Sequence, residues 1–87
     1  MAYYCYMLEC GDGSYYSGWT TNLEKRVKTH AAGDGGRYTR SRLPVMLAYF
    51  EEMDSRSHAM RREFELKKKS HREKKELADL FAKRSAL

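Results

Sequence analysis

The pattern of apolar positions divides the chain into an amino-terminal part typical of strands and a later part typical of helices. Residues 2–10 are rich in aromatic side chains and contain neither glycine nor proline, which predicts a strand. Two glycines in the segment 11–14 favour a turn, and residues 15–19 predict the returning strand of a hairpin. Residues 45–51 have the length and apolar character of a third strand.

The first helix is predicted from Asn22 to about Ala32. Thr21 as N-cap and Glu24 match a capping box, and Gly33 suits the left-handed position that follows a helix. The apolar stripe of this helix consists of Leu23, Val27 and Ala31.

A second helix is predicted with Asp54 or Ser55 as its N-cap, ending at about Lys69. Met60 and Phe64 mark its apolar face.

The remaining segments complete the order of elements. Residues 33–44 contain three glycines, a proline and three arginines, and predict a basic loop rather than a core element. A capping box at residues 70–73 predicts a third helix over about 71–84, in the most basic part of the chain. The order β-β-α-β-α-α over residues 1–87 indicates a single α+β domain with its core at about 3–80.

Composition supports a small folded domain with an anionic partner. Apolar residues make up 41% of the 87 positions and aromatic residues 13%, enough for a core despite 33% charged residues. The net charge of +5 favours nucleic acid or an anionic membrane as partner, although charge also serves solubility. We find neither a secretory signal pattern nor an apolar run that could span a bilayer, so a reducing cytoplasm is the expected compartment.

The two cysteines, Cys5 and Cys10, have opposite parity and would point to opposite faces of one strand. We therefore expect neither a mutual disulfide nor a disulfide-linked partner. Two thiols cannot form a four-cysteine zinc site, and no paired-histidine spacing follows them.

Tyr6 and Tyr16 are the first candidates for a functional site, since they lie on the two predicted hairpin strands. They share a face only if the hairpin loop has three or five residues, and a four-residue loop would separate them. We predict a loop with an odd number of residues, either three or five. Aromatic packing is the alternative explanation for both residues.

Three polar residues border predicted apolar faces. His30 falls within the stripe of the first helix, and Arg26 lies about 60° from Leu23. Glu63 has the same marginal position on the second helix, where an unpaired charge needs compensation. The alternatives are a core histidine, an arginine that extends its head to solvent, and a glutamate in a salt bridge to Arg26 or to a neighbouring helix.

Several short segments together resemble the GIY-YIG nuclease domain, in its small single-domain branch called YhbQ-like. Each fragment alone is weak, but their order and spacing are fairly specific over about residues 3–80. The matching segments are Tyr4-Cys5-Tyr6-Met7-Leu8, Asp12-Gly13-Ser14, Tyr16-Ser17-Gly18-Trp19-Thr20-Thr21, Asn22-Leu23-Glu24-Lys25-Arg26, His30, Gly36-Arg37-Tyr38-Thr39-Arg40, Pro44 and Ala59-Met60-Arg61-Arg62-Glu63.

This resemblance implies a three-stranded antiparallel sheet flanked by helices, and it implies roles for five residues. Tyr6 matches a proposed general base, with His30 as a rival base that some branches place in the site. Tyr16 matches a tyrosine that positions water or phosphate, and Arg26 an arginine that stabilises the scissile phosphate. Glu63 matches the ligand of one divalent metal, for which Mg²⁺ is expected and Mn²⁺ is an alternative.

The chain departs from the family pattern at three places. Tyr4 stands where many members have glycine, and Ser17 where isoleucine is usual. A late asparagine seen in many members has no clear counterpart, because the chain offers Lys67-Lys68-Lys69-Ser70 there. These departures bear on substrate specificity more than on the fold.

The leading hypothesis is a metal-dependent endonuclease acting on DNA, with branched or damaged DNA among the candidate substrates. The alternatives are a non-catalytic nucleic-acid-binding module and a small subunit whose basic helices bind an acidic partner. A nucleic-acid-binding surface is expected from two basic segments, although either can be a solvated charged face. Its residues are Arg37, Tyr38, Arg40, Arg42, Lys67, Lys68 and Lys69.

Overall fold

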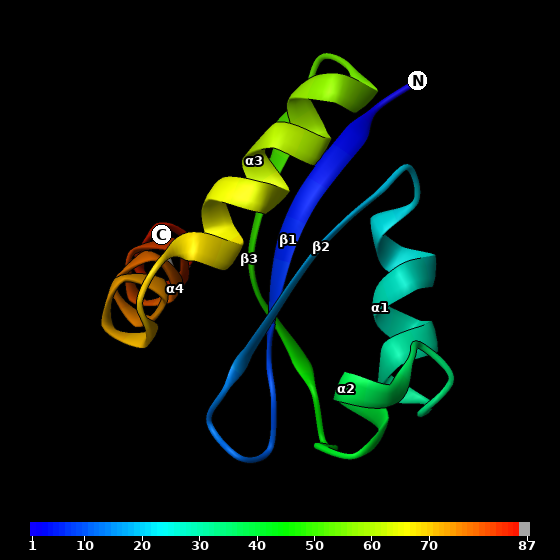
Figure 1. The fold of residues 1–87 in the computed structure, drawn as a ribbon, viewed down its shortest axis with the longest axis vertical. Helices are drawn as coiled ribbons and strands as arrows, with labels where there is room; N and C mark the ends of the chain where they lie inside the picture. The colour runs from blue at the N-terminus through cyan, green and yellow to red at the C-terminus, as the bar shows by residue number, and fades with distance from the viewer. Residues whose placement is uncertain (86–87) are drawn as a thin grey trace.

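The central strand of the sheet is the first one in the chain, and it is covered on both faces. The computed structural model describes residues 1–85 (Figure 1). The sheet is antiparallel with strand order β2-β1-β3, which confirms the predicted fold class. The elements are β1 (Tyr3–Glu9), β2 (Tyr15–Thr20), α1 (Leu23–Ala31), α2 (Arg37–Arg40), β3 (Met46–Met53), α3 (Arg56–Lys68) and α4 (His71–Ser85).

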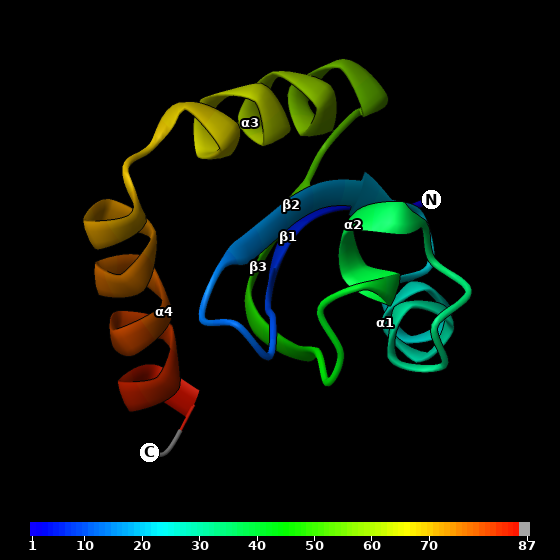
Figure 2. The same cartoon turned by 60° about the horizontal axis from the view of Figure 1, so that its bottom comes forward.

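Two separate core clusters lie on the two faces of the sheet. Figure 2 shows α3 running across one face, with α1 and α2 on the other. On the α3 face, Cys5 and Met7 pack against Ala59 and Leu66. The cluster on the α1 face is formed by Tyr6, Leu8, Cys10 and Val45, with Leu23 and Val27 against it. Cys5 and Cys10 therefore lie on opposite faces, as their parity predicts, and both are free thiols.

The hairpin has the odd loop that the sequence predicts. Leu8 pairs with Tyr16 and Tyr6 with Gly18, so Tyr6 and Tyr16 lie on the same face. The Cys10 amide donates to the Ser14 carbonyl at 2.8 Å, which closes the turn.

Helix α1 begins one residue later than predicted because its N-cap is Asn22, not Thr21. The Asn22 backbone is extended, and its side chain accepts a hydrogen bond from the Lys25 amide at 3.1 Å. The Thr20 hydroxyl accepts from the Asn22 amide at 3.1 Å. Glu24, predicted to complete a capping box, instead contacts Lys28 at 3.1 Å on the helix surface.

The predicted basic loop contains a short helix and a core residue, which corrects the sequence interpretation. Gly36 has φ of 133°, a conformation that side-chain-bearing residues rarely adopt, and it leads directly into α2. Its carbonyl accepts from the Arg40 amide at 3.0 Å. Thr39 of α2 is fully buried, so the segment contributes to the core as well as to the basic surface.

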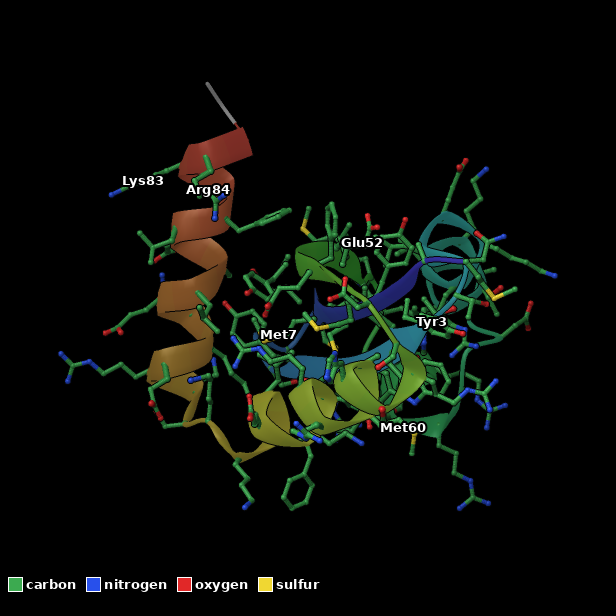
Figure 3. The ribbon with its side chains drawn as sticks, turned by 90° about the horizontal axis from the view of Figure 1, so that it is seen from above. Tyr3, Met7, Glu52, Met60, Lys83 and Arg84 are labelled. Carbon is green, nitrogen blue, oxygen red and sulfur yellow. The ribbon has the colours of Figure 1, made fainter. Side chains whose placement is uncertain are left out.

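The predicted apolar face of the second helix is wrong. Met60 is 50% exposed and Phe64 57% exposed, and Met60 lies on the outer side of α3 (Figure 3). Ala59 and Leu66 are the buried residues instead. The small Ala59 lets the helix approach β1, where the Cys5 thiol donates to the Ala59 carbonyl at 2.8 Å. The volume of the larger side chains misled the prediction, since close packing here requires a small residue.

Helix α4 packs beside β3, and its N-terminus has the predicted capping box. The Ser70 hydroxyl accepts from the Glu73 amide at 3.1 Å, and the Glu73 carboxylate accepts from the Ser70 amide at 3.0 Å. The ring of Phe81 lies 5.2 Å from that of Phe50. His71 Nε2 lies 2.8 Å from the Gly13 carbonyl oxygen and joins α4 to the hairpin turn. No helix in residues 1–85 combines the length and apolarity needed to cross a membrane.

Candidate active site

A polar cleft of about 390 Å³ lies at the free edge of β2. It contains four of the five candidate site residues, which come from four different elements: Tyr6 from β1, Tyr16 from β2, Arg26 from α1 and Glu63 from α3. The other lining residues are Gly18, Trp19, Thr20, Thr21 and Arg56.

A larger groove of about 630 Å³ between α1 and the sheet is apolar. It is lined by residues such as Leu23, Leu47 and Phe50, and by none of the five candidates. Chemistry on a charged substrate needs the polar groups of the smaller cleft.

Gly18 lets the Tyr6 side chain reach the cleft. It pairs with Tyr6 across the sheet, and a Cβ at position 18 would lie 2.5 Å from the Tyr6 hydroxyl oxygen. Any side chain here would displace Tyr6. The glycine therefore serves close approach, since its φ is not in the left-handed region.

His30 lies behind Tyr6 and is not exposed to the cleft. It is 1% exposed, its Nε2 lies 3.3 Å from the Tyr6 hydroxyl, and its Nδ1 lies 2.8 Å from Thr39 Oγ1. Gly35 packs directly on the imidazole, because a Cβ there would lie 2.1 Å from Nδ1. His30 is thus both a satisfied core histidine and the direct neighbour of the candidate base.

Burial holds both partners of this pair in their neutral forms at neutral pH. Desolvation, followed by the field of Tyr16, raises the pKa of Tyr6 to about 12, although Arg26 acts in the opposite direction. Desolvation and then Arg26 lower the pKa of His30 below its usual value. A tyrosinate at position 6 is therefore costly unless its proton moves to a neighbouring group.

Arg26 and Glu63 supply the charges of the cleft. Arg26 is exposed and forms no ion pair with any residue among 1–85. The Glu63 side chain is 23% exposed, and its Oε1 lies 3.7 Å from Lys67 Nζ, a weak contact on the same helix. A salt bridge between Arg26 and Glu63, one of the expected alternatives, is not found among residues 1–85.

The donor set of the cleft fits a hard divalent cation held by one carboxylate. Within residues 1–85, no three His, Cys, Asp or Glu side chains gather as a metal cluster. Glu63 is the carboxylate that faces the cleft. Mg²⁺ commonly uses one or two carboxylates together with waters and substrate phosphate, and this arrangement is compatible with that mode.

Tyr16 connects the cleft to α2. Its ring centroid lies 5.1 Å from that of His30 and 5.8 Å from that of Tyr38. Because Tyr38 is 37% exposed, an aromatic surface continues from the cleft onto the basic segment.

The residues predicted to bind nucleic acid have different environments. Arg37 and Arg40 are exposed on α2. Arg42 donates to Asp12 at 3.1 Å and lies over the Tyr38 ring at 3.9 Å, so it fastens α2 to the hairpin turn. In the lysine run, Lys67 approaches Glu63, Lys68 lies over the Phe64 ring at 4.3 Å, and Lys69 is half-buried.

Sequence reasoning missed the supporting residues of the site. The sequence pattern places Thr39 in a basic loop, and only the spacing Gly36-Arg37-Tyr38-Thr39 within the family pattern draws attention to it. Gly18 and Trp19 belong to a matched motif but carried no assigned role. Arg56 had no signal in the sequence, because its place in the cleft depends on the angle of α3 across the sheet.

Comparison with known proteins identifies the domain. A family model described as the GIY-YIG catalytic domain matches residues 2–76. The chain belongs to the GIY-YIG family. The match covers all five candidate site residues and each element up to the first part of α4.

Small UPF0213 proteins are among the similar GIY-YIG members. A UPF0213 protein of Halobacterium salinarum is 49% identical over 86% of this chain and 97% of its own length. The solution structure of a UPF0213 protein from Bacillus halodurans has a TM-score of 0.57, with 46% identity over 92% of this chain and 85% of that one. A solution structure from E. faecalis has a TM-score of 0.61 at 36% identity, over 94% of this chain and 88% of that one.

Proposed function

We propose that this GIY-YIG protein is a metal-dependent endonuclease that hydrolyses phosphodiester bonds in DNA. The observation that carries the proposal is the convergence of Tyr6, Tyr16, Arg26 and Glu63 on one cleft. GIY-YIG domains generally use a divalent metal, and the domain implies a nucleic-acid substrate. Side chains that pointed into separate pockets would have argued against a common site.

Arg26 binds and stabilises the scissile phosphate. Hydrolysis concentrates negative charge on the phosphate oxygens, and an unpaired guanidinium already in place lowers the cost of that charge. Glu63 would hold Mg²⁺, or Mn²⁺ in its place, which supplies Lewis-acid stabilisation of the same oxygens. Tyr16 positions the phosphate or the attacking water from the opposite strand.

Tyr6 and His30 act in series as the base. As the Tyr6 oxygen accepts a proton from water, the Tyr6 hydroxyl proton passes to His30 Nε2 at 3.3 Å. This transfer requires the tautomer in which His30 carries its proton on Nδ1 and donates it to Thr39 Oγ1 at 2.8 Å, so that Nε2 is free to accept. This order avoids an isolated tyrosinate, which the raised pKa of Tyr6 disfavours. A bound phosphate also compensates the Arg26 charge that lowers the pKa of His30.

The DNA backbone outside the cleft meets the basic segment around α2. Arg37 and Arg40 supply exposed charge, and Tyr38 offers a ring beside Tyr16 on which a base can stack. Arg42 holds this segment in position through Asp12. Lys67 adds positive charge next to Glu63, with Lys68 and Lys69 beyond it.

The test is cleavage of plasmid and branched DNA with Mg²⁺ or Mn²⁺, compared with cleavage in EDTA. Glu63→Gln keeps the shape of the side chain but removes its charge, and cleavage should fall by at least about 100-fold. Glu65→Gln is the matched control, because Glu65 is an exposed carboxylate on the same helix, outside the cleft. Equal cleavage by wild type and Glu63→Gln would contradict the proposal.

A second candidate is a non-catalytic nucleic-acid-binding module with the same fold. The high pKa of Tyr6, about 12, favours it, because a tyrosine that keeps its proton binds but does not act as a base. DNA binding at low salt without cleavage under any metal would support this module. Failure to bind DNA at low salt would instead favour an interaction subunit.

A further inference from the structure

We infer that the cleft contains a second phosphate subsite, formed by Arg56 against Trp19, which binds a DNA backbone phosphate next to the scissile one. The inference rests on the proposed function, since it assumes a nucleic-acid strand in the cleft. It concerns a different residue pair from those that the resemblance assigns.

Arg56 forms no ion pair among residues 1–85, in contrast to three other arginines. Arg42, Arg62 and Arg72 each contact a carboxylate, at 3.1, 2.7 and 3.5 Å respectively. Neither Arg26 nor Arg56 forms an ion pair among residues 1–85. Both line the same cleft, and both are exposed. The cleft thus contains two guanidinium groups that are free to bind an anion.

The ring of Trp19 lies next to the Arg56 guanidinium. The guanidinium carbon of Arg56 lies 5.7 Å from the centre of the Trp19 ring, within the range of a cation–π contact. Trp19 is itself half-buried, because it packs against the core cluster under α3. An arginine held on an anchored ring loses less side-chain entropy on binding phosphate than a freely moving one.

The two arginines approach the cleft from opposite faces of the sheet. Tyr16 and Trp19 have opposite parity on β2, so one lies with the α1 face and the other with the α3 face. Between them, Gly18 has no side chain to divide the cleft. A strand that crosses the edge of β2 at Gly18 would meet Arg26 on one side and Arg56 on the other.

The charge balance also favours more than one phosphate. Two arginines and one glutamate line the cleft, so the cleft is cationic before any metal binds. A single scissile phosphate engages Arg26, which leaves Arg56 for its neighbour along the same strand. Each protein cation that contacts a phosphate releases counterions, so the subsite should steepen the dependence of DNA affinity on salt concentration.

The affinity test uses a short fluorescein-labelled DNA duplex in EDTA, followed by fluorescence anisotropy over a series of salt concentrations. Arg56→Ala should weaken binding about tenfold at low salt and reduce the slope of affinity against salt by about one charge. Arg61→Ala is the matched control, because Arg61 is exposed on the same helix but does not line the cleft. Equal affinities and slopes for the two variants would overturn the inference.

The tryptophan itself gives an independent measurement, since Trp19 is the one tryptophan of the chain. DNA binding should change its fluorescence in the wild type and in Arg61→Ala, and change it much less in Arg56→Ala at equal saturation. An unchanged Trp19 signal in a DNA-bound wild type would also overturn the inference. If the protein cleaves DNA equally well with and without Arg56, the nuclease proposal is supported and the subsite is not. If DNA binding depends on Arg56 but no cleavage occurs, the subsite is supported and the nuclease proposal is not.

Discussion

The two faces of the sheet bury different kinds of side chain. Under α3 the core is apolar, with Cys5, Met7, Ala59 and Leu66, and one hydroxyl without a partner, that of Ser17. On the α1 face, a buried polar row of Tyr6, His30 and Thr39 is hydrogen-bonded throughout. The α3 face therefore has an apolar core and the α1 face a buried polar row, and the cleft, with Glu63 from α3 and Arg26 from α1, lies where the two meet at the β2 edge.

Removal of the Tyr6 hydroxyl should produce the largest effect. Tyr6→Phe keeps the ring but removes the group that accepts the proton, and cleavage should fall about 10³-fold. Single-turnover cleavage at saturating DNA measures the change, and DNA affinity serves as the control because it should stay nearly constant. Cleavage by Tyr6→Phe at the wild-type rate would rule out the Tyr6 hydroxyl as the group that accepts the proton.

The apolar face is tested by Leu66→Ala. Leu66 is fully buried, so its truncation should cost about 3 kcal/mol in free energy of unfolding, through lost burial and a cavity. Denaturant unfolding measures the loss, and Phe64→Ala is the control, because Phe64 is mostly exposed. Under conditions where Leu66→Ala is folded, its cleavage rate should match the wild type.

The pH dependence of stability should reveal the burial of Tyr6. Its folded pKa, about 12, exceeds the ordinary value of 10.0, so the unfolded chain loses this proton first. The stabilisation is fully present below pH 10 and is lost as the pH rises towards 12. Across this window the wild type should lose about 2–3 kcal/mol more than Tyr6→Phe, by denaturant unfolding. Parallel curves for the two proteins would show that Tyr6 is not desolvated.

Thr39 provides a smaller test of the polar face. Thr39→Val keeps the volume but removes the oxygen that holds His30 Nδ1 at 2.8 Å, and cleavage should fall about tenfold. Its DNA affinity should not change, and Thr39→Ser should restore most of the rate. A loss of affinity rather than rate would indicate that Thr39 shapes α2 alone.

Ser17→Ala should have the smallest effect, and it should raise the free energy of unfolding rather than lower it. Ser17 is 3% exposed, and its buried hydroxyl has no hydrogen-bond partner among the described residues. Its removal should stabilise the protein by up to about 1 kcal/mol, because a buried polar group without a partner costs free energy. Thermal unfolding measures the gain, and a clear loss of stability would point to an ordered water at this hydroxyl.

The contrast between the faces also explains what the sequence predicts well. Strand parity is a strict alternation, so the common face of Tyr6 and Tyr16 followed from the loop length alone. Helix caps depend on local chemistry, and the capping box predicted at Ser70 and Glu73 is confirmed. At the first helix, adjacent Thr21 and Asn22 compete, and three-dimensional context favours Asn22.

Helix faces were harder to predict, because burial depends on how closely two elements approach. Ala59 is buried because it is small, and Met60 is exposed although it is apolar. Thr39 and Arg56 reach the site through the path of α2 and the direction of α3, neither of which a sequence period encodes. The motif residues were therefore predictable, and their supporting partners were not.

Each face of the sheet contains a free thiol whose chemical labelling can report when that face opens. Burial raises the pKa of Cys5 to about 11 and also raises the pKa of Cys10, so both thiols resist alkylation while the fold is closed. Labelling of either thiol then reports the local opening that exposes it. Mass spectrometry after brief exposure to an alkylating reagent can separate departures of α3 from departures of the segment around α1 and α2, and so measure which face of the sheet opens first.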